Sequence, residues 1–286
     1  MNKAIGIIGA GRLGGVLAKN LKAAGCVLTG LTCADAEESR TTAHRLGIPP
    51  FADNRALCEA SEVVFITVPD RLIVETAAEL LGGQVRTGTL FIHCSGALSA
   101  FDLPPDERII RGSFHPLQSF AGDNRDLAGI HIALDGEETA MPFLHELCGL
   151  TGGSPLHIPR GERPLYHAAA CLASNHIVAL LSAVQSLFMR WTDRPEEAQA
   201  AFWPLLHGTL DNFKRLGPGK ALTGPIARGD AETVERHLAV LPEEYRDFYI
   251  ALGLQALRIA PTHSALDEKK AEILEKILKQ RCNHGQ

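Results

Sequence analysis

Short apolar runs alternate with segments of helical period along the first half of the chain. The apolar runs are KAIGIIG, CVLTGLT, EVVFITVP, TLFIHCSG, RIIRGSF and GIHIALDG, with a further short strand expected near 155–158. Because these runs are apolar at successive positions, both faces of each strand are expected to be buried, as in a parallel sheet covered by helices. The pattern predicts an α/β fold with a doubly wound, mostly parallel sheet.

The pattern changes near Pro159, after which no strand is predicted. Helices are expected at approximately 163–191, 195–216, 231–240, 243–260 and 265–281. The segment LGPGKALTGP predicts a loop after the second of these helices, because glycine and proline interrupt helical structure. We therefore expect an α/β domain over residues 1–160 and an all-helical domain over residues 161–286.

The predicted helix 163–191 contains the most apolar long stretch of the chain. At about 100° per residue, one arc of this helix collects the polar side chains. These are His167, Cys171, Ser174, Asn175, Ser182 and Gln185. A mainly apolar helix with one polar stripe is expected to be buried, with the stripe facing a cleft or a polar partner, rather than to span a membrane. For Ser182 and Gln185, hydrogen-bonded polar groups at an interface are the alternative.

Composition narrows the class of protein. The chain has 286 residues, a net charge of −5 and seven cysteines. This charge predicts no general affinity for nucleic acid or for an anionic membrane. The cysteines show no metal-binding spacing, so reduced thiols in a cytoplasmic protein are expected. Because the first strand begins almost at the first residue, we expect no signal peptide.

A glycine-rich motif lies between the first predicted strand and the first amphipathic helix. The motif is Gly9, Ala10, Gly11, Arg12, Leu13 and Gly14. In this GxGxxG pattern Gly9 permits the tight turn, Gly11 lets the backbone approach a pyrophosphate, and Gly14 lets the helix pack against the strand. The helix N-terminus offers N–H groups to the anion. The motif and its context predict a dinucleotide site rather than a glycine turn without a ligand.

The end of the second strand bears on the choice between NADP and NAD. That strand ends near Thr32, without the acidic residue that NAD-type folds usually place there. Asp35 comes slightly later and is a candidate helix cap. Arg12, Thr32 and Arg40 are candidates to receive a 2′-phosphate. The sequence therefore favours NADP, with NAD as the alternative.

Two further segments are expected at the carboxyl edge of the sheet, where open α/β sheets bind ligands. Val68 and Pro69 follow the third predicted strand, and Ser95 follows the fourth. We expect these residues to border the cofactor. Asp70 is also a candidate cap of the helix that begins there.

The stretch FHPLQSF follows the apolar run RIIRG. Its proline biases His115 toward an extended conformation. His115 and His167 are candidate acid/base residues, because histidine titrates near neutral pH. We expect His115 and Gln118 to face His167 and Asn175. A capped turn whose histidine only satisfies a backbone group is the alternative interpretation.

The segment GKALTGPIARGD is a candidate substrate-binding loop. Lys220 and Thr223 suit a small anionic substrate, since loops often carry binding residues. Thr223 and Asp230 are also candidate helix caps, and Lys220 is otherwise a solvated side chain.

Several motifs together resemble a known group of proteins. They are GIIGAGRLG, ITVPD, HCSGAL, GSFHPLQSF, YHAAACLASNH and ALTGPIARGD, and the match runs over nearly the whole chain. They resemble uncharacterised Rossmann-like oxidoreductases whose C-terminal helical domain has no assigned function. More distantly, the layout resembles pyrroline-5-carboxylate reductase, ketopantoate reductase and the β-hydroxyacid dehydrogenases. The resemblance implies NADP binding and a homodimer formed through the helical domain.

The chain departs from the more distant families at one position. Ketopantoate reductases and β-hydroxyacid dehydrogenases carry a lysine four residues before an asparagine, whereas here Cys171 precedes Asn175. Either His167 or His115 is a candidate to replace that lysine. The sequence thus predicts an NADP-dependent oxidoreductase that moves a hydride between nicotinamide and a small carbonyl or imine. Asn175 would hold the substrate, and Ser95 and Gln118 would line the pocket. A non-catalytic dinucleotide-binding or regulatory protein is the alternative.

Overall fold

The computed structural model describes residues 3–121, 126–260 and 266–280. The chain divides into two compact units, residues 1–176 and 177–286. The domain limits expected from the sequence stay a prediction. The helical part of the chain begins with α6 (Arg163–Ala173), which belongs to the first unit.

The first unit is built on one seven-stranded sheet with the order β2-β1-β3-β4-β5-β6-β7. Its strands are β1 (Ile5–Ile8), β2 (Leu28–Thr32), β3 (Val63–Ile66), β4 (Thr89–His93), β5 (Ile109–Pro116), β6 (His131–Gly136) and β7 (Ser154–His157). Neighbouring strands pair in parallel, except that β6 runs antiparallel to β5. The predicted α/β fold with a doubly wound, mostly parallel sheet is confirmed.

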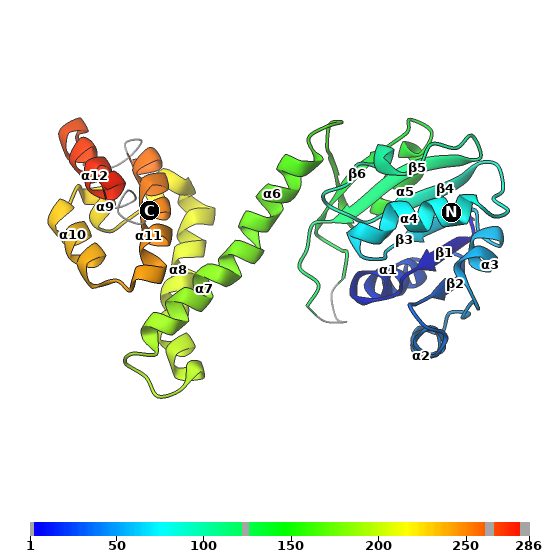
Figure 1. Ribbon diagram of the computed structural model, residues 1–286, viewed down its shortest axis with the longest axis horizontal. Coiled ribbons are helices and arrows are strands. Elements are labelled where there is room, and N and C mark those ends of the chain that lie inside the picture. The colour runs from blue at the N-terminus through cyan, green and yellow to red at the C-terminus, as the bar shows by residue number, and fades with distance from the viewer. Residues whose placement is uncertain (1–2, 122–125, 261–265, 281–286) are drawn as a thin grey trace. The chain divides into compact units, whose positions relative to one another are not determined.

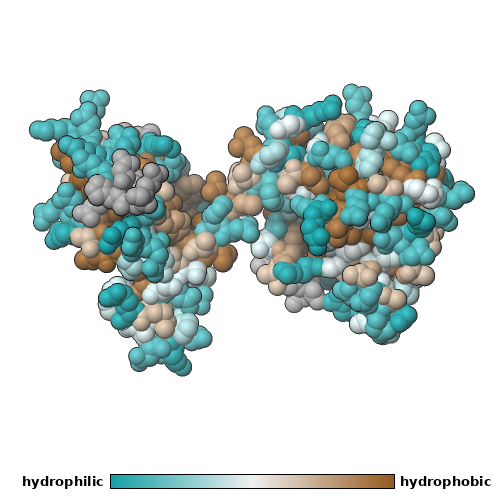
Figure 2. All heavy atoms as spheres, in the orientation of Figure 1, coloured by the Kyte–Doolittle hydropathy of each residue, from teal (hydrophilic) through white to brown (hydrophobic). Residues whose placement is uncertain are grey.

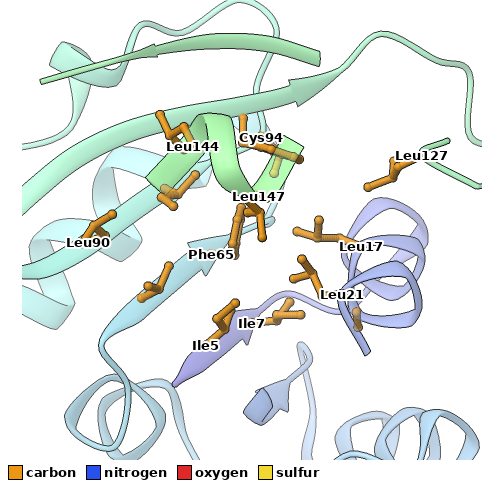
Figure 3. Packing of buried hydrophobic residues seen from close by; sticks show 14 of the residues in the cluster. Ile5, Ile7, Leu17, Leu21, Phe65, Leu90, Cys94, Leu127, Leu144 and Leu147 are labelled. Carbon is orange, nitrogen blue, oxygen red and sulfur yellow. The ribbon is translucent and has the colours of Figure 1, made fainter. Parts of the chain in front are cut away.

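Helices cover both faces of this sheet (Figure 1). They are α1 (Arg12–Ala23), α2 (Ala36–Leu46), α3 (Asn54–Glu59), α4 (Asp70–Leu81) and α5 (Met141–Leu150). Successive strand residues point to opposite faces, so Phe65 packs with Leu17 of α1 and Leu147 of α5 (Figure 3), while Ile66 packs with Ile73 of α4. Both faces are apolar for this reason, as the continuous apolar runs predict.

The parallel register brings four strand ends into one row. Ile8 lies beside Thr32 and Ile66, and Ile66 lies beside His93. The strand order reverses at β1, whose neighbours β2 and β3 lie on either side of it. Open α/β sheets bind ligands outside the carboxyl ends of the strands at such a switch point. The predicted cofactor residues all lie at or just beyond this row.

Strand β5 is longer than the sequence predicted. It continues through His115 to Pro116, where a polar turn was expected, and His115 pairs with Ala133 of β6. The antiparallel partner β6 supplies hydrogen bonds beyond the point where the parallel neighbour β4 ends. Proline is tolerated as the last residue of this strand, and His115 is therefore held in extended backbone.

The predicted single helix 163–191 is two helices. Helix α6 ends at Ala173, Ser174 has φ −128° and ψ −78°, and α7 (Asn175–Phe188) begins directly afterwards. Serine and asparagine form local hydrogen bonds that compete with helix, which accounts for a break at this polar interruption. The sequence interpretation did not weigh this effect against the apolar periodicity.

The expected burial of this region is also wrong. The stretch Arg163–Phe188 is long and apolar enough, by length and composition, to cross a membrane, yet none of its most apolar window is buried. On α7 no residue is buried, although half of its positions are apolar and large. Its apolar side chains are therefore partly or fully exposed to solvent in the single chain.

All the described elements of the second unit are helices. They are most of α7, then α8 (Pro195–Ala221), α9 (Pro225–Arg228), α10 (Ala231–Val240), α11 (Glu243–Ile259) and α12 (Glu268–Gln280). A small core joins α9 to α12 through Ile226, Val234, Ile250 and Leu274. The predicted loop after residue 216 is shorter than expected, because the chain kinks at Gly217 (φ 75°, ψ 171°) and is helical again to Ala221.

Candidate functional site

The glycine motif forms a tight turn between β1 and α1. Gly9 has φ +90°, and the N–H groups of Gly9 and Ala10 both donate to the carbonyl of Thr32, at 2.9 and 3.0 Å. A Cβ atom at Gly14 would lie 2.5 Å from the carbonyl oxygen of Gly9 and from Oγ1 of Thr67. Only glycine lets the start of α1 approach the end of β1 so closely.

Gly11, in contrast, faces open space. Among the described residues, a Cβ atom there would meet nothing within 4 Å, and Gly11 caps α1 without any side-chain hydrogen bond. The first N–H groups of a helix have no partner inside the helix, and here no capping side chain satisfies them. Leu13 is half-buried, whereas Arg12 is exposed beside this turn. The turn therefore fits the pyrophosphate of a dinucleotide, with a cation next to it.

The end of β2 contains the other candidates for a 2′-phosphate. Thr32 is buried, and its hydroxyl donates to Oδ1 of Asn54 at 2.6 Å. Asp35 caps α2 by accepting the N–H of Glu38 at 2.7 Å, as the cap interpretation predicts. Arg40 pairs with Glu37 on the exposed surface of α2.

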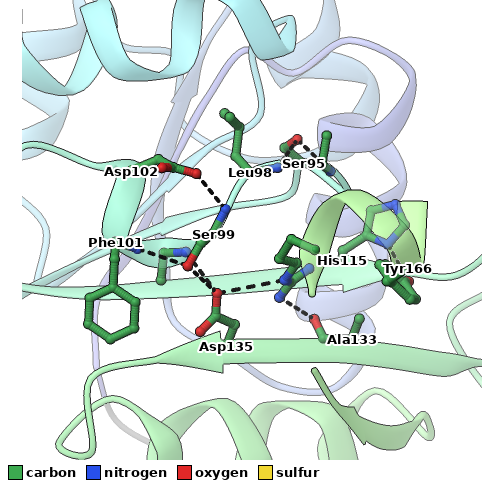
Figure 4. A network of polar contacts seen from close by, with 12 residues as sticks. Ser95, Leu98, Ser99, Phe101, Asp102, His115, Ala133, Asp135 and Tyr166 are labelled. Atoms are coloured by element: carbon green, nitrogen blue, oxygen red, sulfur yellow. Dashed lines mark hydrogen bonds and ion pairs between the residues drawn. The ribbon is translucent and has the colours of Figure 1, made fainter. Parts of the chain in front are cut away.

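Ser95 ties the loop after β4 to the loop after β3. Its hydroxyl donates to Oδ2 of Asp70 at 2.7 Å and accepts the N–H groups of Ala97 and Leu98 at 3.1 and 3.2 Å (Figure 4). Pro69, rather than Asp70, occupies the cap position of α4. The Ser95 hydroxyl thus forms its hydrogen bonds within the protein. Val68 lies against the glycine turn, because its backbone nitrogen is 2.9 Å from the position that a Cβ atom at Gly9 would take.

Two of the predicted histidines come together at Gly96. The rings of His115 and His167 have centroids 6.3 Å apart. A Cβ atom at Gly96 would lie 2.6 Å from Nδ1 of His167 and 2.9 Å from Nε2 of His115. Both imidazoles therefore converge on the loop that follows β4, at the same edge of the sheet as the glycine turn.

A tyrosine that the sequence interpretation missed completes this cluster. Nδ1 of His115 lies 2.7 Å from the hydroxyl of Tyr166 (Figure 4). On the same helix, Nε2 of His167 lies 3.6 Å from Sγ of Cys171. Nδ1 of His167 is buried without a hydrogen-bond partner among the described residues.

A buried ion pair places α6 against the sheet. Arg163 is 1% exposed, its Nε lies 3.6 Å from Oδ2 of Asp135, and its Nη2 donates to the carbonyl of Ala133. Asp135 also accepts the hydroxyl of Ser99 and the N–H of Ala100 (Figure 4). Because Arg163 opens α6, this anchor sets where Tyr166 and His167 lie. Neither Arg163 nor Asp135 belongs to a motif, so only the fold reveals the pair.

Burial dominates the electrostatics of the cluster. Burial, followed by the charge of Arg163, lowers the pKa of His115 from 6.5 to about 4. Burial also lowers the pKa of His93 to about 4 and raises the pKa of Tyr166. At neutral pH His93 and His115 are therefore uncharged, and the Tyr166 phenol keeps its proton.

The remaining predicted site residues make no contact described for this cluster within the first unit, or belong to the second unit. Gln118 is exposed, and its Oε1 accepts the N–H of Ser119. Asn175 is exposed at the start of α7. Lys220 and Thr223 are exposed in the second unit, where Gly224 rather than Thr223 caps α9. Their substrate roles stay predictions.

Two other sequence expectations concern hydrogen-bonded helix residues. Asp230 caps α10 by accepting the N–H of Thr233, as expected. Gln185 donates to the carbonyl of Pro195, so its amide joins α7 to α8. Over the described ranges, no group of three His, Cys, Asp or Glu side chains has the arrangement of a metal site.

Comparison with known families supports this architecture. A Rossmann-like domain model matches residues 2–108. A model described as a domain of unknown function, DUF2520, matches residues 130–256. A comparison with curated proteins found no match.

Solved structures share the fold over nearly the whole chain. Protein TM1727 from Thermotoga maritima is 27% identical, with a TM-score of 0.68, covering 90% of this chain and 98% of that chain. BF3122 from Bacteroides fragilis, described as a candidate NADP oxidoreductase, is 20% identical, with a TM-score of 0.70. The match covers 91% of this chain and 97% of that chain. Pyrroline carboxylate reductase of Plasmodium falciparum, with NADP bound, is 11% identical, with a TM-score of 0.55, covering 96% and 98%. The resemblance seen in the sequence is thus confirmed at the level of the fold.

The two neutral histidines predict an acid-sensitive fold. The pKa of each imidazole is about 4 in the folded protein and 6.5 in the unfolded chain. Between pH 4 and pH 6.5 the unfolded chain therefore binds more protons than the folded protein. Folding stability should be fully present above pH 6.5 and fall as the pH drops toward 4, by roughly 3 kcal/mol for each imidazole. Urea unfolding followed by circular dichroism at several pH values measures this slope.

The variant His115→Asn provides the control for this slope. Between pH 6.5 and 4, the unfolding free energy of this variant should depend less steeply on pH, by the contribution of about one proton. A slope that is the same in the variant and the parent would contradict the burial of a neutral His115.

Proposed function

We propose that this chain, which matches a Rossmann-like domain model and a DUF2520 model, is an NADP-dependent oxidoreductase acting on a small carbonyl or imine. One observation carries the proposal. The open glycine turn at Gly11 and the two imidazoles that converge on Gly96 lie at the same carboxyl edge of one sheet. A dinucleotide bound at the first would extend along the row of strand ends toward the second.

The chain's own residues have clear tasks in cofactor binding. The first N–H groups of α1 hold the pyrophosphate, while Val68, Pro69 and Ser95 border the remainder of the molecule. Arg12 is the proposed contact of the 2′-phosphate, because Arg40 is paired with Glu37. Bound NADPH supplies the hydride.

The proposed reaction needs a proton donor and a group that orients the substrate. His167 is the proposed acid/base residue, with Nδ1 directed at Gly96 and Nε2 next to Cys171. His115, which is neutral at pH 7, donates a hydrogen bond instead of acting as a cationic acid. Asn175, Gln118, Lys220 and Thr223 remain the predicted contacts of a small, anionic substrate.

Hydride exchange with a substrate panel tests the proposal. Small 2-keto acids and cyclic imines are offered with NADPH, and the loss of NADPH absorbance is followed. For a substrate that is accepted, His167→Asn should lower kcat by about 100-fold or more while NADPH still binds, since general acid–base catalysis contributes on this scale. His237→Asn, which removes an imidazole in the second unit, should leave the rate unchanged.

Two outcomes would contradict the proposed function or the residue roles within it. If His167→Asn and His115→Asn both keep full activity, the assigned roles are wrong. If NADPH binds but no member of the panel exchanges hydride, the protein is better described as a non-catalytic dinucleotide-binding protein.

The environments of Gly11 and Gly14 predict different effects of substitution on stability. Gly11→Val adds a side chain in open space, so stability should change by at most about 1 kcal/mol while NADPH affinity falls at least about tenfold. Gly14→Val forces a Cβ against the Gly9 carbonyl, so it should lower the unfolding temperature as well. Fluorescence titration with NADPH and thermal unfolding separate the two effects, and unchanged NADPH affinity in Gly11→Val would rule out the glycine turn as the site.

The exposed apolar side chains of α7 and α8 are the proposed homodimer surface. Val178 is 67% exposed, Leu205 72% and Phe213 56%, and Figure 2 shows hydrophobic residues at the surface where these helices lie. Large exposed apolar surfaces mark interaction sites. A second copy of the chain would cover them, in agreement with the dimer that the sequence resemblance implies.

The double variant Leu205→Asp/Phe213→Asp tests this surface. Light scattering after size exclusion should give a dimer for the parent and a monomer for the variant, because two charges would be buried without partners. Leu150→Asp, at an exposed apolar position on α5, should remain dimeric. A parent that is monomeric at micromolar concentration, or that partitions into lipid vesicles, would overturn the proposal.

A further inference from the structure

Tyr166 and His115 form a close pair between α6 and β5. The phenol oxygen lies 2.7 Å from Nδ1 of His115, and the two rings meet edge to face at 5.6 Å and 87°. The backbone holds both partners, because His115 lies within a paired strand and Tyr166 follows the anchored Arg163 by three residues. The contact is therefore a fixed feature of the first unit.

The chemistry of the pair decides where the imidazole proton lies. A phenol hydroxyl is a stronger hydrogen-bond donor than a neutral imidazole N–H, and an imidazole nitrogen is a stronger acceptor than a phenol oxygen, so the favoured arrangement has Tyr166 donating to Nδ1 of His115. Burial raises the pKa of Tyr166, which keeps the phenol protonated. Nδ1 of His115 then accepts, so the ring proton is on Nε2. Nε2 is the atom that lies 2.9 Å from the Cβ position at Gly96, on the side of the cluster where His167 also points.

We propose that Tyr166 is a positioning residue that keeps the proton of neutral His115 on Nε2, so that His115 offers an N–H to the substrate oxygen or nitrogen beside Gly96. The inference rests on the proposed function and adds a role within it. A neutral imidazole can polarise a carbonyl or imine by hydrogen bonding while the proton itself comes from another group. His167, on the other side of Gly96, is that group.

The surroundings of His115 separate the effect of Tyr166 from that of burial. Arg163, His167 and His93 disfavour the cationic imidazole, and Asp70 favours it. Together with burial, the first three keep His115 neutral whether or not the phenol is present. The Tyr166 hydroxyl acts on Nδ1 alone, so its hydrogen bond selects between the two neutral forms of the ring. The position of the proton, rather than the charge, is therefore the property to measure.

Nitrogen NMR of protein labelled with ¹⁵N-histidine reads the proton position directly, without cofactor or substrate. The His115 signals are assigned by their loss in His115→Asn. At pH 7 the parent protein should show His115 neutral, with Nε2 protonated and Nδ1 unprotonated. Tyr166→Phe should show a mixture of both neutral forms and a raised His115 pKa, because the bond that favours neutral Nδ1 is gone.

The second unit contains a matched control pair. Nδ1 of His237 lies 2.8 Å from the hydroxyl of Tyr249, with ring centroids 5.9 Å apart at 88°. Tyr249→Phe should change the His237 signals, because the hydroxyl that contacts Nδ1 is gone, and leave those of His115 unchanged.

The outcomes distinguish this inference from the proposed function. A parent His115 protonated on Nδ1, or the same proton position in Tyr166→Phe, overturns the role of Tyr166 whatever the activity. If the panel yields a substrate, Tyr166→Phe should lower kcat about tenfold at unchanged NADPH affinity, since one oriented hydrogen bond is weakened. If the proton position is as expected but no hydride is transferred, the proposed function fails and the assignment of the proton stands.

Discussion

Two glycines, Gly14 and Gly96, have no room for a side chain, and this constraint sets the geometry at the carboxyl edge of the sheet. At Gly14 the start of α1 lies against the carbonyl of Gly9 and the hydroxyl of Thr67. At Gly96 the loop after β4 lies against the rings of His115 and His167. Any other residue would push apart either the helix and its strand or the two imidazoles and the loop. The geometry of the glycine turn depends on the close packing of α1 against Gly9. The geometry of the histidine cluster depends on the close packing of the loop after β4 against the two rings.

Most of the fold could be predicted from the sequence, because burial of a parallel sheet leaves a strong pattern. Each apolar run became a strand, and the change near Pro159 marks where the helices begin. One prediction failed because a longer-range partner decides the outcome, and another failed because of a local effect. Strand β5 extends through His115 because β6 pairs with it, which the local sequence does not reveal. The helix break at Ser174 reflects a local competition that the apolar pattern concealed.

The candidate site was predictable only in its motif-bearing parts. The glycine turn follows from spacing, and the two histidines were chosen for their chemistry. Tyr166 was missed although it immediately precedes His167, because its partner His115 is 51 residues away. Arg163 and Asp135 were missed for the same reason, since their pairing depends on how α6 meets β6. One signal was available, namely that an arginine and a tyrosine occur within one turn of the predicted active-site histidine.

The proposed function assigns three tasks to separate parts of this site. The start of α1 offers unpaired N–H groups to phosphate, where a helix has its positive end. In the proposed function, half-buried His115 offers a neutral N–H, and His167, on the other side of Gly96, is the proposed group that moves a proton. The Arg163–Asp135 pair supports both, because it holds α6 and its side chains at the edge of the sheet.

A crystal structure with NADPH tests the central claim most directly, namely that the hydride is transferred at the edge of the sheet where His115 and His167 meet. The account predicts that the pyrophosphate lies on the glycine turn and that the reactive nicotinamide carbon lies beside Gly96. It should leave room there for a substrate atom at about 3–3.5 Å, with both imidazoles in reach. A nicotinamide ring bound away from Gly96, with the two histidines remote from it, would contradict the account.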